Sequence, residues 1–266
     1  MRLELDAPPP KYKSASQKAR VTTESWIAEN FYCPSCGSGL SPYPHGHRVY
    51  DFTSASCGED FQLKSASHRF GSTVLGSEYR TTLNSILNNL QHSLILLSYE
   101  RDKWIVENLS LVHRGCITST CIIPRKPLSS SARRAGWEGC LISLERIPKL
   151  GQIEVVNGRQ VRAKSEVLAQ LKQTHSLLTT PTESRGWLTD ILSCVERLLS
   201  SFSLGDVYAF EDELVKRHPN NHNIRPKIRQ QLQVLRDLKL VKFVGPGRYQ
   251  YLGKFTESWR KSSKPT

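Results

Sequence analysis

A carboxylate, an amide and a lysine lie in two short strand-like runs. Asp51 belongs to the run 49–53, and Gln62, Leu63 and Lys64 belong to the next. Side chains alternate along a strand, so Gln62 and Lys64 share a face, and a hairpin would bring Asp51 beside them. We predict that Asp51, Gln62 and the Leu63 carbonyl bind Mg²⁺, while Lys64 orients the water that attacks a phosphodiester. The alternative is a solvated strand end with no catalytic role.

Three cysteines near these runs have the spacing of a metal site. Cys33 and Cys36 precede a glycine, as in a metal knuckle, and Cys57 lies between the two strand-like runs. Structural zinc takes four thiolate or imidazole ligands in a tetrahedron. We therefore predict a structural Zn²⁺ site with His45 or His47 as the fourth ligand. The alternative is three buried thiols beside solvent-exposed histidines.

An amphipathic pattern over residues 223–238 predicts a DNA-reading helix. The apolar positions have helical spacing and face a core: Ile228, Leu232, Leu235 and Leu238. The other face carries side chains that bind base edges or phosphates: Arg225, Lys227, Arg229, Gln230, Gln233 and Arg236. A hairpin follows, with its turn at residues 245–247 and Arg248 beside it, which predicts a winged helix. The alternative is a winged helix that binds another protein.

A second basic segment lies in the middle of the chain. Arg125, Lys126, Arg133 and Arg134 fall close to Trp137 in a stretch that reads as a loop. Four cations and an indole could follow a DNA backbone and stack on a base. Taken alone, a tryptophan is more often a core residue than a DNA-reading one.

The overall charge favours a polyanionic partner. The 266 residues carry a formal net charge of +13, spread along the chain, with a pI of about 9.5. Nucleic acid is the first candidate and an anionic membrane surface the second. No apolar run approaches the roughly 18 residues of a membrane span, and residues 1–13 lack a signal peptide's apolar core. We expect a cytoplasmic protein with no membrane partner, whose seven cysteines are thiols or metal ligands.

The elements that must position these residues form two parts. A helix is predicted over 14–30, with Ser14 as its cap, and another over 79–89. Apolar runs predict a mixed sheet from strands at residues 93–99, 104–112, 141–144 and 153–156. After a polar boundary at 174–185, three helices are predicted at residues 187–199, 203–217 and 223–238. Ser203 and Asp206 have the spacing of a capping box.

The motifs in this order resemble the methyl-directed restriction endonucleases of the DpnI family. The matching strings are SQKAR (16–20), YCPSCG (32–37), DF (51–52), FQLKS (61–65), RKPL (125–128), ARRAGW and GC (132–140), SRGW (184–187), and KIRQQLQ and LRD (227–237). Together they cover nearly all of residues 14–252. The resemblance implies an α/β (α+β) PD-(D/E)xK nuclease domain with a zinc knuckle, followed by a winged helix.

The same resemblance implies an activity and assigns residues to it. It implies Mg²⁺-dependent double-strand cleavage of 5′-GATC-3′ that contains N6-methyladenine, as in type II (IIM) restriction systems. Asp51 falls on the family's first metal carboxylate, Lys64 on its catalytic lysine, and Trp137 on an aromatic residue that helps to read the methyl groups. We expect a flexible arm at 1–13, the nuclease domain at 14–180, the winged helix at 181–256, a basic tail at 257–266, and a monomer.

Two positions depart from the family pattern. Gln62 stands where the family has its second acidic residue; an amide oxygen still ligates Mg²⁺ but carries no charge. Glu59 or Asp60 could supply the missing charge, and Asp60 shares a face with Gln62. Ser54 stands where the family has the first cysteine of a second pair, so the zinc site is completed by a histidine or weakened. Gln62 leaves an alternative function open, a regulator that binds methylated GATC without cutting it.

Overall fold

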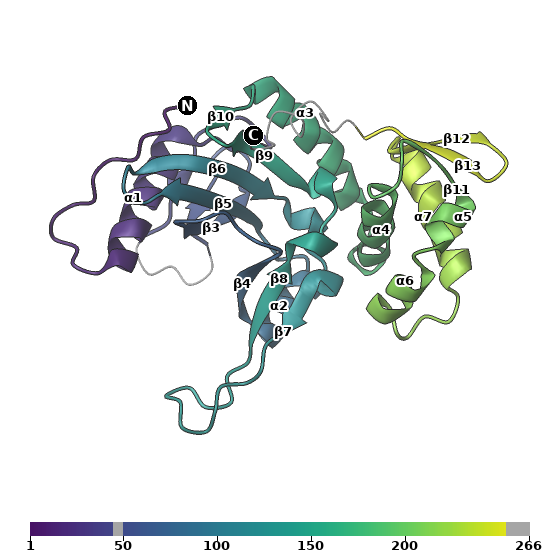
Figure 1. The fold of residues 1–266 in the computed structure, drawn as a ribbon, viewed down its shortest axis with the longest axis horizontal. Coiled ribbons are helices and arrows are strands. Elements are labelled where there is room, and N and C mark those ends of the chain that lie inside the picture. The colour runs from purple at the N-terminus through teal and green to yellow at the C-terminus, as the bar shows by residue number, and fades with distance from the viewer. Residues whose placement is uncertain (45–49, 254–266) are drawn as a thin grey trace. The chain divides into compact units, whose positions relative to one another are not determined.

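The computed structural model describes residues 1–44 and 50–253. The chain divides into two compact units, and each is described by itself (Figure 1). The first unit comprises the described residues of Met1–Gly71, His92–Arg114 and Gly151–Thr174, and the second comprises Ser72–Gln91, Gly115–Leu150 and residues 175–253. The chain therefore passes between the two units more than once.

The first unit is built on a mixed sheet of seven strands in the order β1-β2-β3-β5-β6-β9-β10. The strands are β1 (Ser41–Pro42), β2 (Phe52–Thr53), β3 (Asp60–Ala66), β5 (Ser93–Glu100), β6 (Ile105–Val112), β9 (Gln152–Asn157) and β10 (Gln160–Val161). β3 and β5 are parallel, and the other neighbours are antiparallel. β5 is buried along almost its whole length, which explains its continuous apolar run. β3, which carries Gln62 and Lys64, pairs directly with this buried strand.

The first unit contains helix α1 (Ala15–Asn30) and almost all of helix α3 (Lys164–His175). The predicted cap of α1 is confirmed, because the Ser14 hydroxyl accepts a hydrogen bond from the Gln17 N–H over 3.2 Å. Trp26 of α1 is buried in one apolar cluster with Phe52 and Phe61 of the β2–β3 hairpin. This packing fixes the hairpin from its apolar side and leaves its other face for polar residues.

The N-terminal residues differ from the predicted flexible arm at 1–13. The Leu5 N–H donates to the Trp104 carbonyl over 2.7 Å, and the Val106 N–H donates to the Leu3 carbonyl over 2.9 Å. Leu5 itself is buried. β9 pairs with β6 only from Leu109 onward. At the start of β6, the N-terminal residues take the place of β9 and pair with its backbone groups. Two leucines in a polar stretch gave no sequence signal for this pairing.

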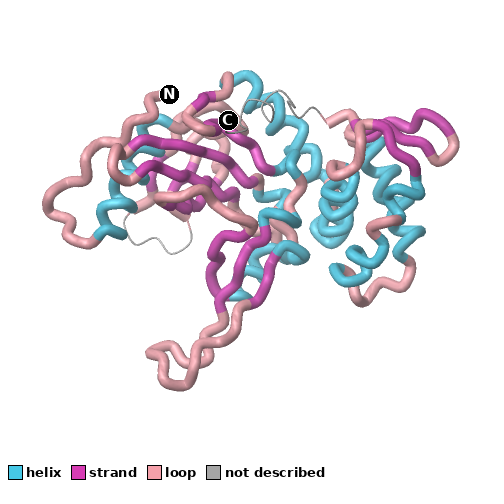
Figure 2. The backbone as a smooth tube through the Cα atoms, viewed as in Figure 1, coloured by secondary structure: helices cyan, strands magenta, loops and turns pink. Residues whose placement is uncertain are grey.

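The second unit begins with a small sheet and a helix. Its strands lie in the order β4 (Thr73–Glu78), β8 (Gly139–Ser143), β7 (Ile122–Pro124), and helix α2 (Tyr79–Leu87) follows β4. The Glu78 carboxylate caps α2 by accepting from the Arg80 and Thr81 N–H groups over 3.1 and 2.6 Å. Loop 125–138 joins β7 to β8 and projects well beyond the two strands (Figure 2). The basic segment predicted from the sequence is this projecting loop.

The rest of the second unit is a winged helix. Its elements are α4 (Thr182–Val195), β11 (Ser201–Ser203), α5 (Leu204–Tyr208), α6 (Glu211–Arg217), α7 (Ile224–Asp237), β12 (Val241–Gly245) and β13 (Arg248–Tyr251). The three strands form a sheet in the order β11-β13-β12. Short 3-10 helices elsewhere in the chain span Arg114–Cys116, Ser119–Cys121, Leu144–Arg146, Lys149–Gly151 and Ser176–Thr179.

The capping box at Ser203 and Asp206 is confirmed, with both reciprocal hydrogen bonds present. The single helix expected over 203–217 is wrong, because the structure divides it into α5 and α6. Three acidic residues form the first turn of α6. Their negative charges interact favourably with the positive end of the helix dipole, which favours a new helix start at this point. The Arg197 guanidinium also lies 4.5 Å from the centre of the Phe210 ring at the break.

Candidate active site and metal knuckle

The β2–β3 hairpin brings Asp51 beside the two candidate residues of β3. Phe52 pairs with Phe61 in antiparallel register, which places Asp51 opposite Gln62. The Asp51 N–H donates to the Phe61 carbonyl over 2.9 Å, and the Leu63 N–H donates to Asp51 Oδ2 over 2.7 Å. The carboxylate is therefore held against β3 by the backbone of the next strand. This is the juxtaposition that the strand spacing predicted.

Gln62 and Lys64 lie on the face of β3 opposite to Phe61, which is completely buried. Both are half-buried, and their parallel neighbours on β5 are Leu94 and Leu96. β3 pairs with β5 from Phe61 to Ala66, which fixes the backbone that carries Gln62 and Lys64. A side chain that orients a water molecule or a metal ion requires such a rigid support.

Several residues beside this face carried no sequence signal. Burial, together with the nearby Lys64 ammonium, lowers the pKa of His92 to about 4, while Asp60 acts in the opposite direction. His92 is therefore neutral near pH 7. Its ring meets the Tyr50 ring edge-on, with centroids 5.2 Å apart. The Tyr43 hydroxyl donates to Asp60 Oδ1 over 2.9 Å. Only the tertiary fold brings these residues to β3, since no motif includes them.

Glu59 and Asp60 differ in what their carboxylates contact. The Ser93 hydroxyl donates to Glu59 Oε1 over 2.8 Å, and the Ser35 hydroxyl donates to the other oxygen. Ser35 belongs to the cysteine knuckle and Ser93 begins β5, so Glu59 joins the knuckle to the sheet. Asp60 stands on the face of β3 that carries Gln62, as its position two residues earlier requires. Asp60 is thus the better placed of the two to add negative charge near Gln62.

The three predicted cysteines converge. The sulfur atoms of Cys33, Cys36 and Cys57 all lie within 4.8 Å of one another, and those of Cys33 and Cys57 are 3.6 Å apart. A tetrahedral zinc ion with thiolate ligands at about 2.3 Å separates its sulfurs by about 3.8 Å. The cluster could therefore hold a zinc ion. His45 and His47, predicted as the fourth ligand, lie outside the described residues.

The two thiols of the first knuckle have different acidities. Burial raises the pKa of the Cys33 thiol to about 12. Burial also acts to raise the pKa of Cys36, but hydrogen bonds from Ser38 and Ser54 outweigh it and lower the pKa to about 6. Because zinc binds thiolates, Cys36 can bind the metal near pH 7 without losing a proton, whereas Cys33 must first lose its proton to solvent.

The projecting loop presents its cations to solvent. The side chains of Arg125, Lys126, Arg133 and Arg134 are all exposed. The Arg134 guanidinium lies 4.8 Å from the centre of the Trp137 ring. Trp137 is half-buried, and among the described residues its Nε1 has no hydrogen-bond partner. A Cβ atom on Gly139 would lie 2.7 Å from the Trp137 ring, so only glycine permits this position of the indole.

Helix α7 has the amphipathic arrangement that the sequence predicted. Ile228, Leu232 and Leu235 are fully buried, and Leu238 is half-buried. On the outer face the residues are exposed, except for the half-buried Lys227: Arg225, Arg229, Gln230, Gln233 and Arg236. Arg248 is also exposed, at the start of β13.

Some of these cations contact other residues of the protein. Arg225 Nε donates to Glu211 Oε2 over 2.8 Å, and Arg229 Nη1 donates to the Tyr208 hydroxyl over 2.7 Å. The Arg236 guanidinium lies 4.9 Å from the Phe243 ring centre. Tyr208 carried no sequence signal, because its role depends on the packing of α5 against α7.

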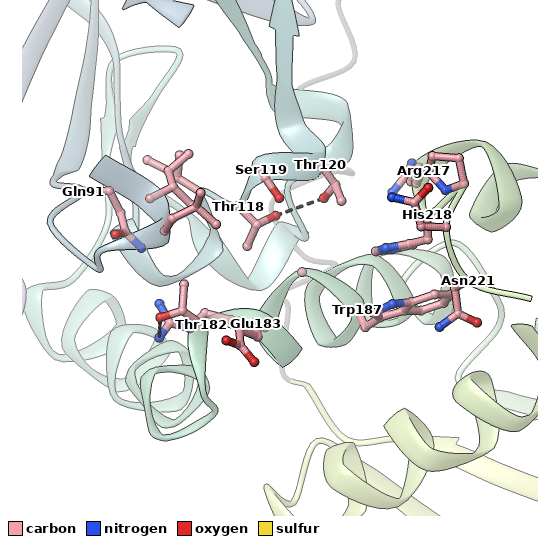
Figure 3. A pocket seen from close by; sticks show the side chains of 17 residues that line it. Gln91, Thr118, Ser119, Thr120, Thr182, Glu183, Trp187, Arg217, His218 and Asn221 are labelled. Atoms are coloured by element: carbon pink, nitrogen blue, oxygen red, sulfur yellow. Dashed lines mark hydrogen bonds between the residues drawn. The ribbon is translucent and has the colours of Figure 1, made fainter. Parts of the chain in front are cut away.

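A cavity of about 420 Å³ lies within the second unit (Figure 3). Trp187 and His218 stack at its wall, with ring centroids 3.7 Å apart. Beside them the completely buried Asp190 accepts from Arg217 over 2.7 Å and contacts His218 Nε2 over 2.8 Å. These contacts join α4 to the end of α6 and stabilise the winged helix. None of them was predicted.

Comparison with known families identifies the chain. The family model DpnI, described as the Dam-replacing family, matches residues 1–180. The model DpnI_C, described as the Dam-replacing HTH domain, matches residues 183–251. The chain belongs to the Dam-replacing family. Membership in this family implies a restriction nuclease with a methylation-dependent function, and the HTH domain indicates DNA as the partner. Among the described residues, no helix is both long and apolar enough to cross a membrane.

Proposed function

We propose that the protein is an endonuclease that makes double-strand breaks at 5′-GATC-3′ sites carrying N6-methyladenine, with Mg²⁺ as the catalytic ion. The observation that carries the proposal is Asp51, held against β3 beside Gln62 and Lys64, in a member of the Dam-replacing family. Asp51, Gln62 and the Leu63 carbonyl would hold the ion. When bound, Mg²⁺ supplies charge stabilisation at the attacked phosphate.

The protein's own residues would act as follows. Lys64, an ammonium on the Gln62 face, orients the attacking water and offsets the charge that develops on the phosphate. The parallel pairing of Lys64 with Leu96 on the buried strand β5 fixes the backbone from which the Lys64 side chain extends. His92 is neutral near pH 7 and adds no charge of its own to the site. Zn²⁺ bound by Cys33, Cys36 and Cys57 would be structural.

Two DNA-reading surfaces support the choice of substrate. Loop 125–138 presents four cations and Trp137, and α7 presents arginine and glutamine. Burying one methyl group is worth about 0.8 kcal/mol, or about a fourfold preference. Two methyl groups in a palindromic site give roughly fifteenfold, and reading both in two domains gives roughly two hundredfold. A second DNA-reading domain therefore has a physical use in methyl-directed cleavage. Val234 is the apolar candidate on the outer part of α7.

A second candidate function follows from Gln62. A neutral amide in place of a carboxylate weakens the attraction for Mg²⁺, which favours a protein that binds methylated GATC without cutting it, as a regulator does. Asp60 on the same face of β3 favours cleavage instead, because it adds negative charge nearby.

One experiment separates the two functions. Fully methylated, hemimethylated and unmethylated GATC duplexes are incubated with the purified chain, with Mg²⁺ or with EDTA. We expect Mg²⁺-dependent cutting that is fastest on the fully methylated duplex. Tight binding of that duplex without cutting would establish the regulator instead. Equal cutting of all three duplexes would show a nuclease without methyl specificity.

A further inference from the structure

The cysteine site contains two turns of the same construction. In the first, the Gly37 N–H donates to the Cys33 carbonyl over 2.7 Å; in the second, the Gly58 N–H donates to the Ser54 carbonyl, also over 2.7 Å. Both glycines have positive φ, +78° and +68°. Each turn is closed by a hydrogen bond across five residues and presents the side chains of its first and fourth positions. Ser54 therefore occupies the place in the second turn that Cys33 occupies in the first.

The Ser54 hydroxyl points into the cluster of sulfur atoms. Ser54 is completely buried, and its Oγ lies 3.3 Å from Cys36 Sγ and 3.0 Å from Ser38 Oγ. A tetrahedral zinc ion with sulfur at about 2.3 Å and oxygen at about 2.0 Å separates the two ligand atoms by about 3.5 Å. The observed Cys36–Ser54 distance is close to that edge, as the Cys33–Cys57 distance of 3.6 Å is close to a sulfur–sulfur edge.

We propose that the Ser54 hydroxyl oxygen is the fourth ligand of the zinc site, which therefore has three sulfur ligands and one oxygen ligand. The proposal rests on the zinc site assigned above to Cys33, Cys36 and Cys57, and is independent of DNA cleavage. The oxygen donates a lone pair to the metal and keeps its proton, and Ser38 Oγ, 3.0 Å away, is within hydrogen-bond distance of it. This assignment replaces the histidine ligand, His45 or His47, expected from the sequence.

A site of this composition differs in its chemistry from one with four thiolates. A neutral hydroxyl contributes no charge and is a harder donor than a thiolate, so it holds zinc less strongly. The weakest ligand is also the one most readily replaced by an entering chelator. We therefore expect a folded protein whose zinc is more exchangeable than that of a four-cysteine knuckle.

Cobalt substitution tests the ligand set directly. Co²⁺ replaces Zn²⁺ in tetrahedral sites, and its visible bands move to longer wavelength as oxygen or nitrogen is replaced by thiolate. The measurement uses the full-length protein and its Ser54→Cys, Ser54→Ala and His45→Ala/His47→Ala variants. Circular dichroism first confirms that each variant is folded. Zinc affinity is then measured by competition with a chromophoric chelator.

The outcomes are distinct. We expect Ser54→Cys to move the cobalt bands to longer wavelength and to tighten zinc binding by tenfold or more. In Ser54→Ala a water molecule should take the open position, so zinc binding should weaken while the cobalt spectrum stays close to that of the parent; the double histidine variant should match the parent in both measurements. Parental zinc affinity in Ser54→Ala, unshifted cobalt bands in Ser54→Cys, or an altered spectrum and weaker binding in the double histidine variant, would each overturn the proposal. Neither measurement depends on DNA, so a failure here is separate from a failure of the proposed nuclease.

Discussion

The backbone N–H of Leu63 donates a 2.7 Å hydrogen bond to the carboxylate of Asp51. Asp51 precedes β2, so this bond crosses from one strand to the next and fixes the carboxylate next to Gln62. This bond orients one carboxylate oxygen, and within the described part of the chain no hydrogen bond reaches the other. The hydrogen bond between Leu63 and Asp51 therefore holds an acidic group rigidly in the proposed metal site before any ion binds.

Lys64→Ala should reduce the rate of DNA cleavage by a hundredfold or more, the scale of losing one contact to the transition state. Binding of methylated DNA should change little, because one ammonium contributes little to a many-contact interface. The rate is measured on methylated plasmid and the affinity by fluorescence anisotropy. Lys172→Ala, on the exposed face of α3, is the matched control. Parental cutting by the Lys64 variant would place the active site elsewhere.

Gln62→Glu should lower the Mg²⁺ concentration that gives half-maximal cleavage by about tenfold, since it adds a negative charge to the proposed metal site. Gln62→Ala, which removes the amide oxygen, should have the opposite effect. The measurement is a Mg²⁺ titration of the initial cutting rate. If both variants retain the parental Mg²⁺ dependence, Gln62 is not a metal ligand.

Trp137→Ala should slow the cutting of fully methylated DNA by roughly fifteenfold, the value expected when two methyl groups lose their apolar contact. Binding to unmethylated DNA should stay nearly constant, because the loop cations are unchanged. Trp137→Phe keeps an aromatic surface and should restore most of the preference. Cutting rates and affinities on matched duplexes check this. Equal losses on methylated and unmethylated DNA would show that Trp137 supports the loop and does not read the methyl group.

Gln233→Ala and Lys227→Ala should affect DNA binding in different ways. The exposed Gln233 side chain of α7 could read a base edge, so its loss should reduce discrimination between sequences at one position. Lys227 would contact phosphate, so its loss should weaken binding to all sequences and reduce the salt slope by about 1. Anisotropy titrations of the full chain at several salt concentrations separate the two effects. Identical behaviour of the two variants contradicts this division of roles.

Glu196 should make the stability of the second unit depend on pH. Its carboxylate accepts from the Leu150 N–H over 2.9 Å and from the Tyr251 hydroxyl over 3.2 Å. Burial outweighs these hydrogen bonds and raises the pKa of Glu196 from 4.5 to about 7. In this pH range the folded state binds more protons than the unfolded state, so the free energy of unfolding falls as pH rises from about 4.5 to about 7.

Denaturant unfolding of the parent and of Glu196→Gln at pH 5 and pH 8 checks this prediction. The amide of the variant does not titrate. When the pH is raised from 5 to 8, the unfolding free energy of the variant should therefore increase relative to that of the parent. Glu183→Gln, an exposed position on α4, is the matched control and should follow the parent at both pH values. A constant difference between parent and variant would show that Glu196 has an ordinary pKa.

The sequence by itself determined the features that depend on local periodicity and spacing. The alternation of β3 already put Gln62 and Lys64 on one face, and the pattern over 223–238 already separated the core of α7 from its polar face. The cysteine spacing predicted the knuckle, and the capping pairs predicted the starts of α1 and α5. Each of these signals lies within a few residues of chain, so a single sequence contains it.

Only the tertiary structure decided which distant residues meet. The parallel pairing of β3 with β5 brought His92 close to Lys64, and the fold carried Glu59 between Ser35 and Ser93. The second turn of the knuckle placed the Ser54 hydroxyl among the sulfur atoms, where the sequence had suggested a histidine. Such contacts depend on strand order and on how the chain closes its long loops. Strand order and loop closure leave no periodic signal in the sequence, because they join residues that lie far apart in the chain. The energy of such contacts is gained only after those distant residues have been brought together.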